Sequence, residues 1–136
     1  TPLNMAPELV IGDGKASAKV DVWSVGVVIF QLAGHEYPIK AGSIPELQKL
    51  MRQPRIIRPV SIQDNQLWDL LSHCLDFDRT KRFSAAEALQ HPYFTGEQAQ
   101  QQINAEARQI AQQSLALQQR GDQSITLYDI DPFKYK

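Results

Sequence analysis

Side chains that could bind a metal ion or act as a nucleophile are few in this sequence. Three histidines, His35, His73 and His91, and a single cysteine, Cys74, are spread along the chain without the short spacings that are typical of zinc ligands. Cys74 falls on an apolar stripe of a predicted helix, so we expect a buried and unreactive thiol. The residue types therefore predict no metal site and no cysteine chemistry.

Composition narrows the class of protein. The chain has 136 residues, 43% of them hydrophobic, with 14 basic and 15 acidic side chains and a formal net charge of −1. A nucleic-acid binder usually carries a basic excess, so we expect no nucleic-acid partner. The longest apolar run, Val25 to Phe30, is far shorter than the roughly 20 residues that span a bilayer, so we expect no membrane contact. With one cysteine and no signal-peptide pattern, we predict an intracellular, cytoplasmic protein.

Residues 17–33 form the most apolar segment of the chain. A helix that is apolar on every side must be buried on every side. The many β-branched residues equally allow a buried strand, and periodicity alone cannot separate the two. The length of the segment favours a helix, and Gly34 supplies a stop signal. The apolar residues of the segment are Val20, Val22, Trp23, Val25, Val27, Val28, Ile29, Phe30 and Leu32.

Three further helices carry clearer signals. Ser43 and Glu46 have the spacing of a capping box, and the helix that they open should end before Pro54. Ser84 and Glu87 repeat that spacing before a short helix that stops at His91. Between them, residues 64–75 place an apolar stripe on one helix face, made of Leu67, Leu70, Leu71, Cys74 and Leu75. No run alternates as a strand would, so the sequence predicts a mainly α fold with long loops.

The composition changes after residue 94. Nine glutamines lie between Glu97 and Arg120, and the chain predicts one Gln-rich helix over 95–120 that starts at a cap-like Thr95 and ends before Gly121. Its apolar face is thin, so the helix needs a partner surface to be stable. That face consists of Ile103, Ala107, Ile110 and Leu117. We assign no fold to the tail, 121–136, and predict three regions: 1–94, 95–120 and 121–136.

Four short stretches, read in order, resemble the eukaryotic Ser/Thr protein kinase family. They are Thr1-Pro-Leu-Asn-Met-Ala-Pro-Glu8, which ends in the A-P-E motif; Asp21-Val-Trp-Ser-Val-Gly26, which leads into the apolar helix; Leu75-Asp-Phe-Asp78, followed by Arg82; and His91-Pro-Tyr-Phe94. By this resemblance, residues 1–94 are identified as the C-terminal part of a kinase large lobe, from the A-P-E motif to the end of the kinase domain.

The resemblance implies a role for a charge at each end of this region. Glu8 should form a buried ion pair with Arg82, and that pair would hold the end of the activation segment against the last helices. If the pair were broken, a desolvated charge would be left alone, which typically costs ~3–5 kcal/mol. The alternative is that both side chains are solvated surface charges of little energetic value.

Three more residues take roles from the resemblance. Asp21 matches the acid that accepts hydrogen bonds from the backbone amides of the catalytic loop; alternatively, it is an ordinary acid in a first helical turn. Thr1 matches the threonine of the loop that seats the substrate residue after the phosphoacceptor. In the family, the hydroxyl of that threonine reaches the catalytic aspartate and helps to select serine and threonine over tyrosine. Leu3 lines the same loop; alternatively, it is simply exposed. The alternative for Thr1 is a loop residue with no fixed partner.

Residues at three positions depart from the family pattern. Asn4 stands where the family usually has an aromatic residue in the substrate-seating loop. Arg79 replaces a common proline between Asp78 and Arg82, and Ile39 replaces an aromatic residue after Pro38. These differences leave the fold prediction intact, but Asn4 weakens the prediction of standard substrate recognition.

The family motifs that perform phosphoryl transfer are not in this sequence. They are a Gly-rich loop, a strand lysine, the catalytic loop H-R-D-x-x-x-x-N and the metal-holding D-F-G, and Gly12-Asp13-Gly14 has neither the spacing nor the strand pattern of the first. All of them precede A-P-E in family order. We therefore expect a full-length kinase that uses ATP and Mg²⁺ and acts on protein substrates. In this chain we expect no catalytic residue and no cofactor, and a partly uncovered 17–33 helix.

A second reading assigns the full-length protein to the pseudokinases or to non-catalytic binding modules. Its motivation is Asn4 together with the composition change after Phe94. In that reading, residues 95–136 recruit a protein partner.

Overall fold

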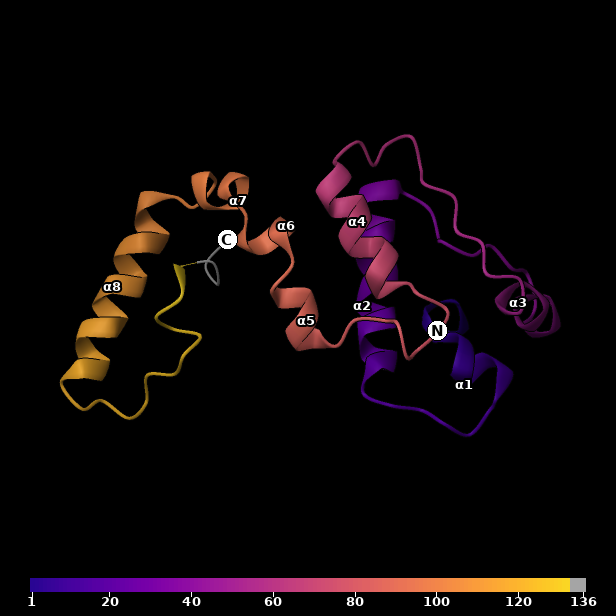
Figure 1. Ribbon diagram of the computed structural model, residues 1–136, viewed down its shortest axis with the longest axis horizontal. Coiled ribbons are helices and arrows are strands. Elements are labelled where there is room, and N and C mark those ends of the chain that lie inside the picture. The colour runs from indigo at the N-terminus through magenta and orange to yellow at the C-terminus, as the bar shows by residue number, and fades with distance from the viewer. Residues whose placement is uncertain (133–136) are drawn as a thin grey trace. The chain divides into compact units, whose positions relative to one another are not determined.

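The computed structural model describes residues 1–132, which fall into two compact units (Figure 1). The first unit is Thr1–Gln90, and the second begins at His91. The described residues form helices and loops and contain no strand, which confirms the mainly α prediction. The last four residues of the predicted tail lie outside the described part.

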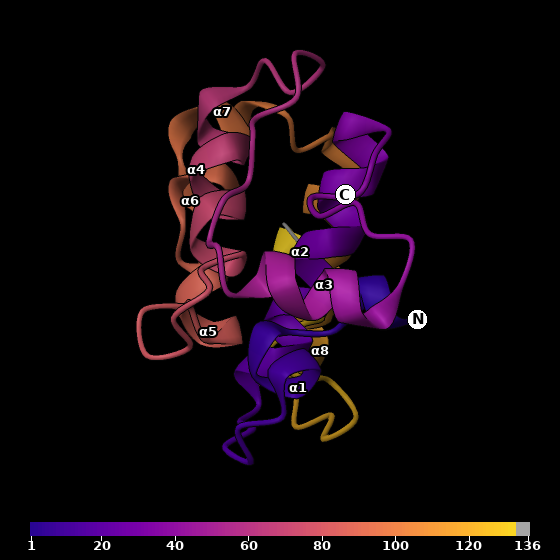
Figure 2. The same ribbon diagram turned by 90° about the vertical axis from the view of Figure 1, so that its right-hand side faces the viewer.

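The first unit is built around one long helix. Its elements are the 3-10 turn η1 (Pro2–Asn4) and the helices α1 (Pro7–Ile11), α2 (Lys19–Gly34), α3 (Ile44–Met51), α4 (Asn65–Cys74) and α5 (Ala85–Leu89). Helix α2 contacts η1 and α4, and α1 contacts α3 (Figures 1 and 2). The 17–33 segment is therefore a helix and not a strand.

One face of α2 forms the centre of the core. Trp23, Val27 and Phe30 are at most 1% exposed and follow one another at helical spacing. Helix α2 approaches the end of α4 closely at Gly26, where a Cβ atom would lie 3.0 Å from Cδ2 of Leu75 and 3.1 Å from Cβ of Cys74. A larger residue at position 26 would push these two helices apart.

The opposite face of α2 is uncovered. Val25, Val28 and Leu32 are 56%, 45% and 73% exposed. The expectation of burial on all sides is therefore wrong for these three residues in this chain, because η1 and α4 cover only one side of the helix. The expectation of a partly uncovered helix agrees with this exposure.

The helix ends show which capping signals were effective. Ser84 and Glu87 form the predicted capping box. Ser43 accepts from the Glu46 amide, but the Glu46 carboxylate accepts from the Gly42 amide, so that box is only half formed.

The stop after α2 also differs in detail from the prediction. Gly34 is still helical, and the left-handed residue is His35, with φ of 58°. The glycine is needed for space, because a Cβ atom there would lie 2.9 Å from Cγ of Pro59.

The second unit corrects the prediction of a single helix over 95–120. Three helices are present in its described residues: α6 (Pro92–Thr95), α7 (Glu97–Gln101) and α8 (Ala105–Gln119). The chain breaks before Asn104 because the Oδ1 atom of Asn104 accepts from the Ala107 amide at 2.7 Å and starts a new helix. Thr95 is not an N-cap; Gly96 takes that place without a side-chain bond.

The packing of the second unit follows the predicted apolar face in part. Ile103 and Ala107 are buried, while Leu117 is 43% exposed and Ala111 is buried in its place. None of the helices in residues 1–132 combines the length and the apolar character that a membrane crossing requires.

Candidate functional site

Glu8 and Arg82 meet in a buried, bidentate ion pair. The two guanidinium NH groups of Arg82 donate to the two carboxylate oxygens of Glu8 at 2.8 and 2.9 Å. The side chains are 4% and 0% exposed. Two parallel charge-assisted hydrogen bonds in a dry setting are among the strongest that side chains form. They join α1 to the loop that precedes α5.

Two of the three remaining N–H donors of Arg82 also have backbone partners. Its Nε donates to the carbonyl of Asp76 at 2.9 Å, and an NH group donates to the carbonyl of Lys19 at 3.2 Å. In return, Nζ of Lys19 donates to the carbonyl of Arg82 at 2.6 Å. The guanidinium therefore links α1, the start of α2 and the turn after α4.

Trp23 of α2 shields this ion pair. The Cζ atom of Arg82 lies 5.2 Å from the centroid of the Trp23 ring, within cation–π range. Phe77 meets the same ring edge-on at 5.2 Å. The indole Nε1 of Trp23 is buried and has no hydrogen-bond partner among residues 1–132. The contribution of Trp23 is thus its ring, through packing and the cation–π contact.

The electrostatics of the pair favour its charged form. Burial acts to raise the pKa of Glu8, but the hydrogen bonds from Arg82 and the positive charge of that residue outweigh burial and hold the pKa below its ordinary value. Glu8 is therefore ionised at neutral pH in the folded protein.

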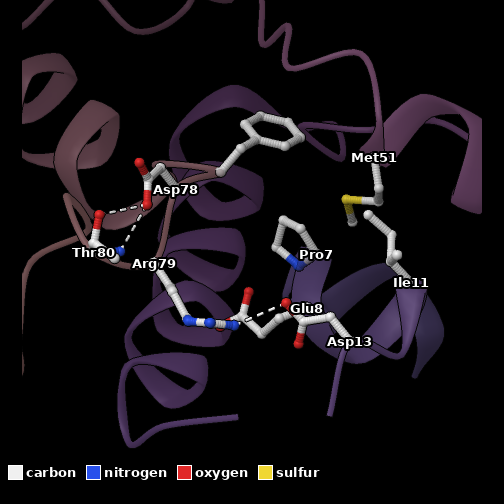
Figure 3. A pocket seen from close by; sticks show the side chains of 9 residues that line it. Pro7, Glu8, Ile11, Asp13, Met51, Asp78, Arg79 and Thr80 are labelled. Atoms are coloured by element: carbon white, nitrogen blue, oxygen red, sulfur yellow. Dashed lines mark hydrogen bonds and ion pairs between the residues drawn. The ribbon is translucent and has the colours of Figure 1, made fainter. Parts of the chain in front are cut away.

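A second, more exposed ion pair lies next to the first. Arg79 donates to a carboxylate oxygen of Asp13 at 2.8 Å, and their side chains are 27% and 43% exposed. The pair borders a pocket of about 290 Å³ (Figure 3), whose apolar wall includes Ile11 and Met51. A backbone hydrogen bond from Lys15, and then Arg79, lower the pKa of Asp13.

Sequence reasoning identified Arg79 as a departure from the family but missed Asp13 as its partner. Part of the signal for this ion pair was present in the sequence, because Arg79 stands where the family commonly has an uncharged proline. The partner lies far away in sequence, so only the fold brings the two charges together.

The loop that contains Thr1 and Leu3 is fixed to α2. The Ser24 hydroxyl donates to the carbonyl of Asn4 at 2.8 Å, and Leu3 packs against the core. Thr1 is exposed, and its side chain makes no capping hydrogen bond to η1. The Oδ1 atom of Asn4 is buried without a partner in the described part of the chain. The structure thus places Leu3 and Asn4 firmly and leaves the Thr1 hydroxyl open.

Asp21 lies exposed in the first turn of α2. A carboxylate there is favoured by the helix dipole, which is the ordinary reading of this residue. Its position is also compatible with a role as an anchor for backbone amides outside this chain. The role of Asp21 stays a prediction.

The histidines and the cysteine take structural positions. His73 stacks on Phe83 with ring centroids 4.3 Å apart, and Nδ1 of His91 accepts from the Tyr93 amide. Across residues 1–132, no three metal-ligating side chains come together. The described residues therefore supply no set of ligands for the family's magnesium, and no chemical step through that ion follows from them.

Cys74 should be unreactive in the folded protein. Burial raises the pKa of its thiol to about 11, so only about one thiol in a thousand is ionised at pH 8. We expect iodoacetamide to modify Cys74 at least ~100-fold more slowly in native protein than in urea, as followed by mass spectrometry. Equal rates in the two conditions would show that the thiol is accessible.

The fold and the motifs together define the class of this chain: the helical C-terminal part of a protein kinase large lobe. Residues 1–94 match the family model described as protein kinase domain. The chain belongs to the eukaryotic Ser/Thr protein kinase family.

Individual relatives agree with this assignment. The chain is 32% identical over 132 residues to "Serine/threonine-protein kinase ULK3" of Mus musculus. The aligned region covers 93% of this chain and 27% of the relative. It is 34% identical over 97 residues to the Homo sapiens protein of the same name, and this aligned region covers 68% of the chain and 20% of the relative. "Probable serine/threonine-protein kinase CCRP1" of Zea mays is 35% identical over 95 residues, and this aligned region covers 68% of the chain and 15% of the relative. The chain thus spans about a quarter or less of the length of these relatives.

Proposed function

We propose that the full-length protein containing this chain transfers the γ-phosphoryl group of ATP to serine and threonine residues of proteins. Within it, this chain supplies the structural and substrate-seating part of the large lobe and none of the catalytic residues. The observation that carries the proposal is the buried pair between Glu8 and Arg82, which fixes the segment after the substrate-seating loop.

The contacts around this loop support the proposed roles. Glu8 holds α1, and Ser24 holds the carbonyl of Asn4, so the chain from Thr1 to α1 is fixed at two points on either side of Met5. A loop held in this way can present Thr1 and Leu3 to a substrate in one geometry. Asp21 would accept hydrogen bonds from the backbone of the catalytic loop, which belongs to the rest of the protein.

The test is a kinase assay on the full-length protein with peptides that differ only in serine, threonine or tyrosine at the acceptor position. We expect phosphorylation of the serine and threonine peptides. Thr1→Val should lower kcat/KM roughly 10- to 100-fold, because it removes the hydroxyl that, by the family resemblance, reaches the catalytic aspartate in the rest of the protein, and Thr1→Ser should restore most of the activity. Thr126→Val in the tail is the matched control, and should leave kcat/KM unchanged.

Two results would count against these roles. A full-length protein that binds ATP but phosphorylates none of the peptides would contradict the kinase proposal. Unchanged kcat/KM in Thr1→Val would remove Thr1 from the site while leaving the proposed activity intact.

A second candidate function is that of a pseudokinase or scaffold whose 95–136 segment binds a protein partner. The unpartnered Oδ1 of Asn4 and the separate compact unit that begins at His91 favour it. An upstream sequence without the catalytic aspartate and the metal-binding aspartate would rule out the kinase activity. If deleting residues 95–136 from the full-length protein leaves partner pull-down unchanged, the segment is not the binding element.

A further inference from the structure

The connection between α3 and α4 carries a concentration of positive charge that the overall composition conceals. Between Leu47 and Gln63 the chain contains four cations, Lys49, Arg52, Arg55 and Arg58, and no carboxylate. In the part of the chain that the structure describes, no ion pair neutralises any of the four. A chain of net charge −1 thus has one local stretch of net charge +4.

The segment 53–58 within this connection contains neither helix nor strand (Figure 1). Its side chains alternate between two sides, as in a strand. Gln53, Arg55 and Ile57 line one groove, whereas Pro54 and Ile56 line a different pocket beside Trp68. Ile57 is 67% exposed, so its aliphatic side chain is accessible to a partner at the edge of this groove.

The groove on the exposed side has an apolar floor and a positive rim. Its volume is about 610 Å³, and Phe30, Ile39 and Leu50 form its apolar wall. The one carboxylate in the lining, Glu36, is already paired with Lys40. Arg55 is therefore the unpaired charge among the residues that line the rim. The groove favours a ligand in which an apolar group stands next to a negatively charged group.

The backbone of the 53–58 segment is also available. Among the described residues, no backbone hydrogen bond links Arg55, Ile56 or Ile57 to the rest of the protein. An extended segment with open N–H and C=O groups can accept another extended chain alongside it, and side-chain pockets at alternate positions then give specificity. Pro54 and Pro59 limit this open edge to a few residues.

We propose that the groove formed by Phe30, Ile39, Leu50, Arg55 and Ile57 is a docking site for an extended acidic peptide of a protein partner. The peptide pairs with the backbone of the 53–58 segment, its acidic side chains face Arg55 and the neighbouring cations, and one apolar side chain fills the groove beside Ile57. The site does not involve Thr1 or Leu3, so it goes beyond the proposed kinase activity and does not depend on phosphoryl transfer.

The experiment measures fluorescence anisotropy of a short labelled peptide, with a central phenylalanine flanked on both sides by acidic residues, on the full-length protein without nucleotide. We expect binding that weakens with added salt. Arg55→Glu should weaken binding by roughly tenfold or more, because repulsion replaces attraction. Ile57→Ser should weaken it roughly three- to tenfold through lost apolar contact. Arg120→Glu, an equal charge change at an exposed arginine of the second unit, is the matched control and should leave affinity unchanged.

Peptide variants separate the three parts of the proposal. A peptide with alanine for phenylalanine, one with serines for the acids, and one N-methylated at alternate backbone nitrogens should each bind more weakly. Unfolding curves check that each protein variant folds, and Arg55→Gln serves as a milder second variant.

Several outcomes would overturn the site. One is an equal loss of peptide affinity in Arg120→Glu and Arg55→Glu, which would indicate that the peptide responds to the net charge of the protein and not to this groove. Another is full affinity of the N-methylated peptide, which would exclude backbone pairing. Tighter, Arg55-dependent binding of a DNA duplex or of phosphatidylserine vesicles would assign the segment to a different polyanion. Because no ATP is present, none of these results depends on whether the protein is an active kinase.

Discussion

Replacing Arg82 by methionine should lower the free energy of unfolding of the full-length protein by about 3–5 kcal/mol. Methionine has a similar length but no charge, so Glu8 would be left ionised in a site where its side chain is only 4% exposed. The carbonyls of Asp76 and Lys19 would also lose their donor. Urea unfolding followed by circular dichroism measures the change.

The neighbouring Arg79–Asp13 pair provides the control. Arg79→Met removes a salt bridge whose side chains are 27% and 43% exposed, and it should cost no more than about 1 kcal/mol. The double variant Glu8→Leu/Arg82→Met should be more stable than Arg82→Met alone, because it removes the stranded charge. Equal costs for Arg79→Met and Arg82→Met would contradict the assignment of Arg82 as a buried structural charge.

The pH dependence of stability gives an independent check on the same pair. The folded state holds the pKa of Glu8 below its ordinary value, so its contribution to stability is present above the unfolded pKa, near ~4.3. The contribution is lost as the pH falls through the lower, folded pKa. In Arg82→Met, protonation of Glu8 instead relieves a buried charge. The stability difference between the two proteins should therefore begin to narrow above the unfolded pKa, as Glu8 of Arg82→Met becomes protonated, and should narrow further below ~4.3, where the wild-type contribution is lost.

The elements of the first unit were predictable because their signals are local. Capping residues such as Ser84, the leucine stripe of α4 and the apolar length of α2 each act within a few residues of sequence. The meeting of Glu8 and Arg82 is different. No spacing rule relates two charges so far apart in sequence, and it was the family resemblance, not the pattern of residues, that suggested the pair.

The failures have physical reasons as well. In the 95–120 segment, the glutamine-rich composition hid the effect of one residue, since the side chain of Asn104 competes for backbone amides and starts a new helix. The ion pair between Asp13 and Arg79 was missed because it depends on tertiary folding. The basic 47–63 stretch was missed because the net charge of the whole chain averages its cations with acids elsewhere.

The second large effect concerns the ring that covers the ion pair. Trp23→Ala should lower the free energy of unfolding by about 3–5 kcal/mol, because it opens a cavity at a residue that is 0% exposed. It also removes the cation–π contact with Arg82 and the edge-on contact with Phe77. Circular dichroism, rather than tryptophan fluorescence, follows unfolding in both proteins.

Trp23→Phe separates the ring from the indole nitrogen. The Nε1 atom of Trp23 is buried without a partner among the residues that the structure describes, and an unpartnered buried donor costs roughly 1–3 kcal/mol. Phenylalanine removes that donor and keeps an aromatic face toward Arg82, so the gain should offset much of the lost volume. We therefore expect Trp23→Phe to lie within about 1 kcal/mol of the wild-type protein. If Trp23→Phe were as destabilising as Trp23→Ala, the indole N–H would have to hold a hydrogen bond in solution, and the shielding of the ion pair would have to be reassigned from the ring to that bond.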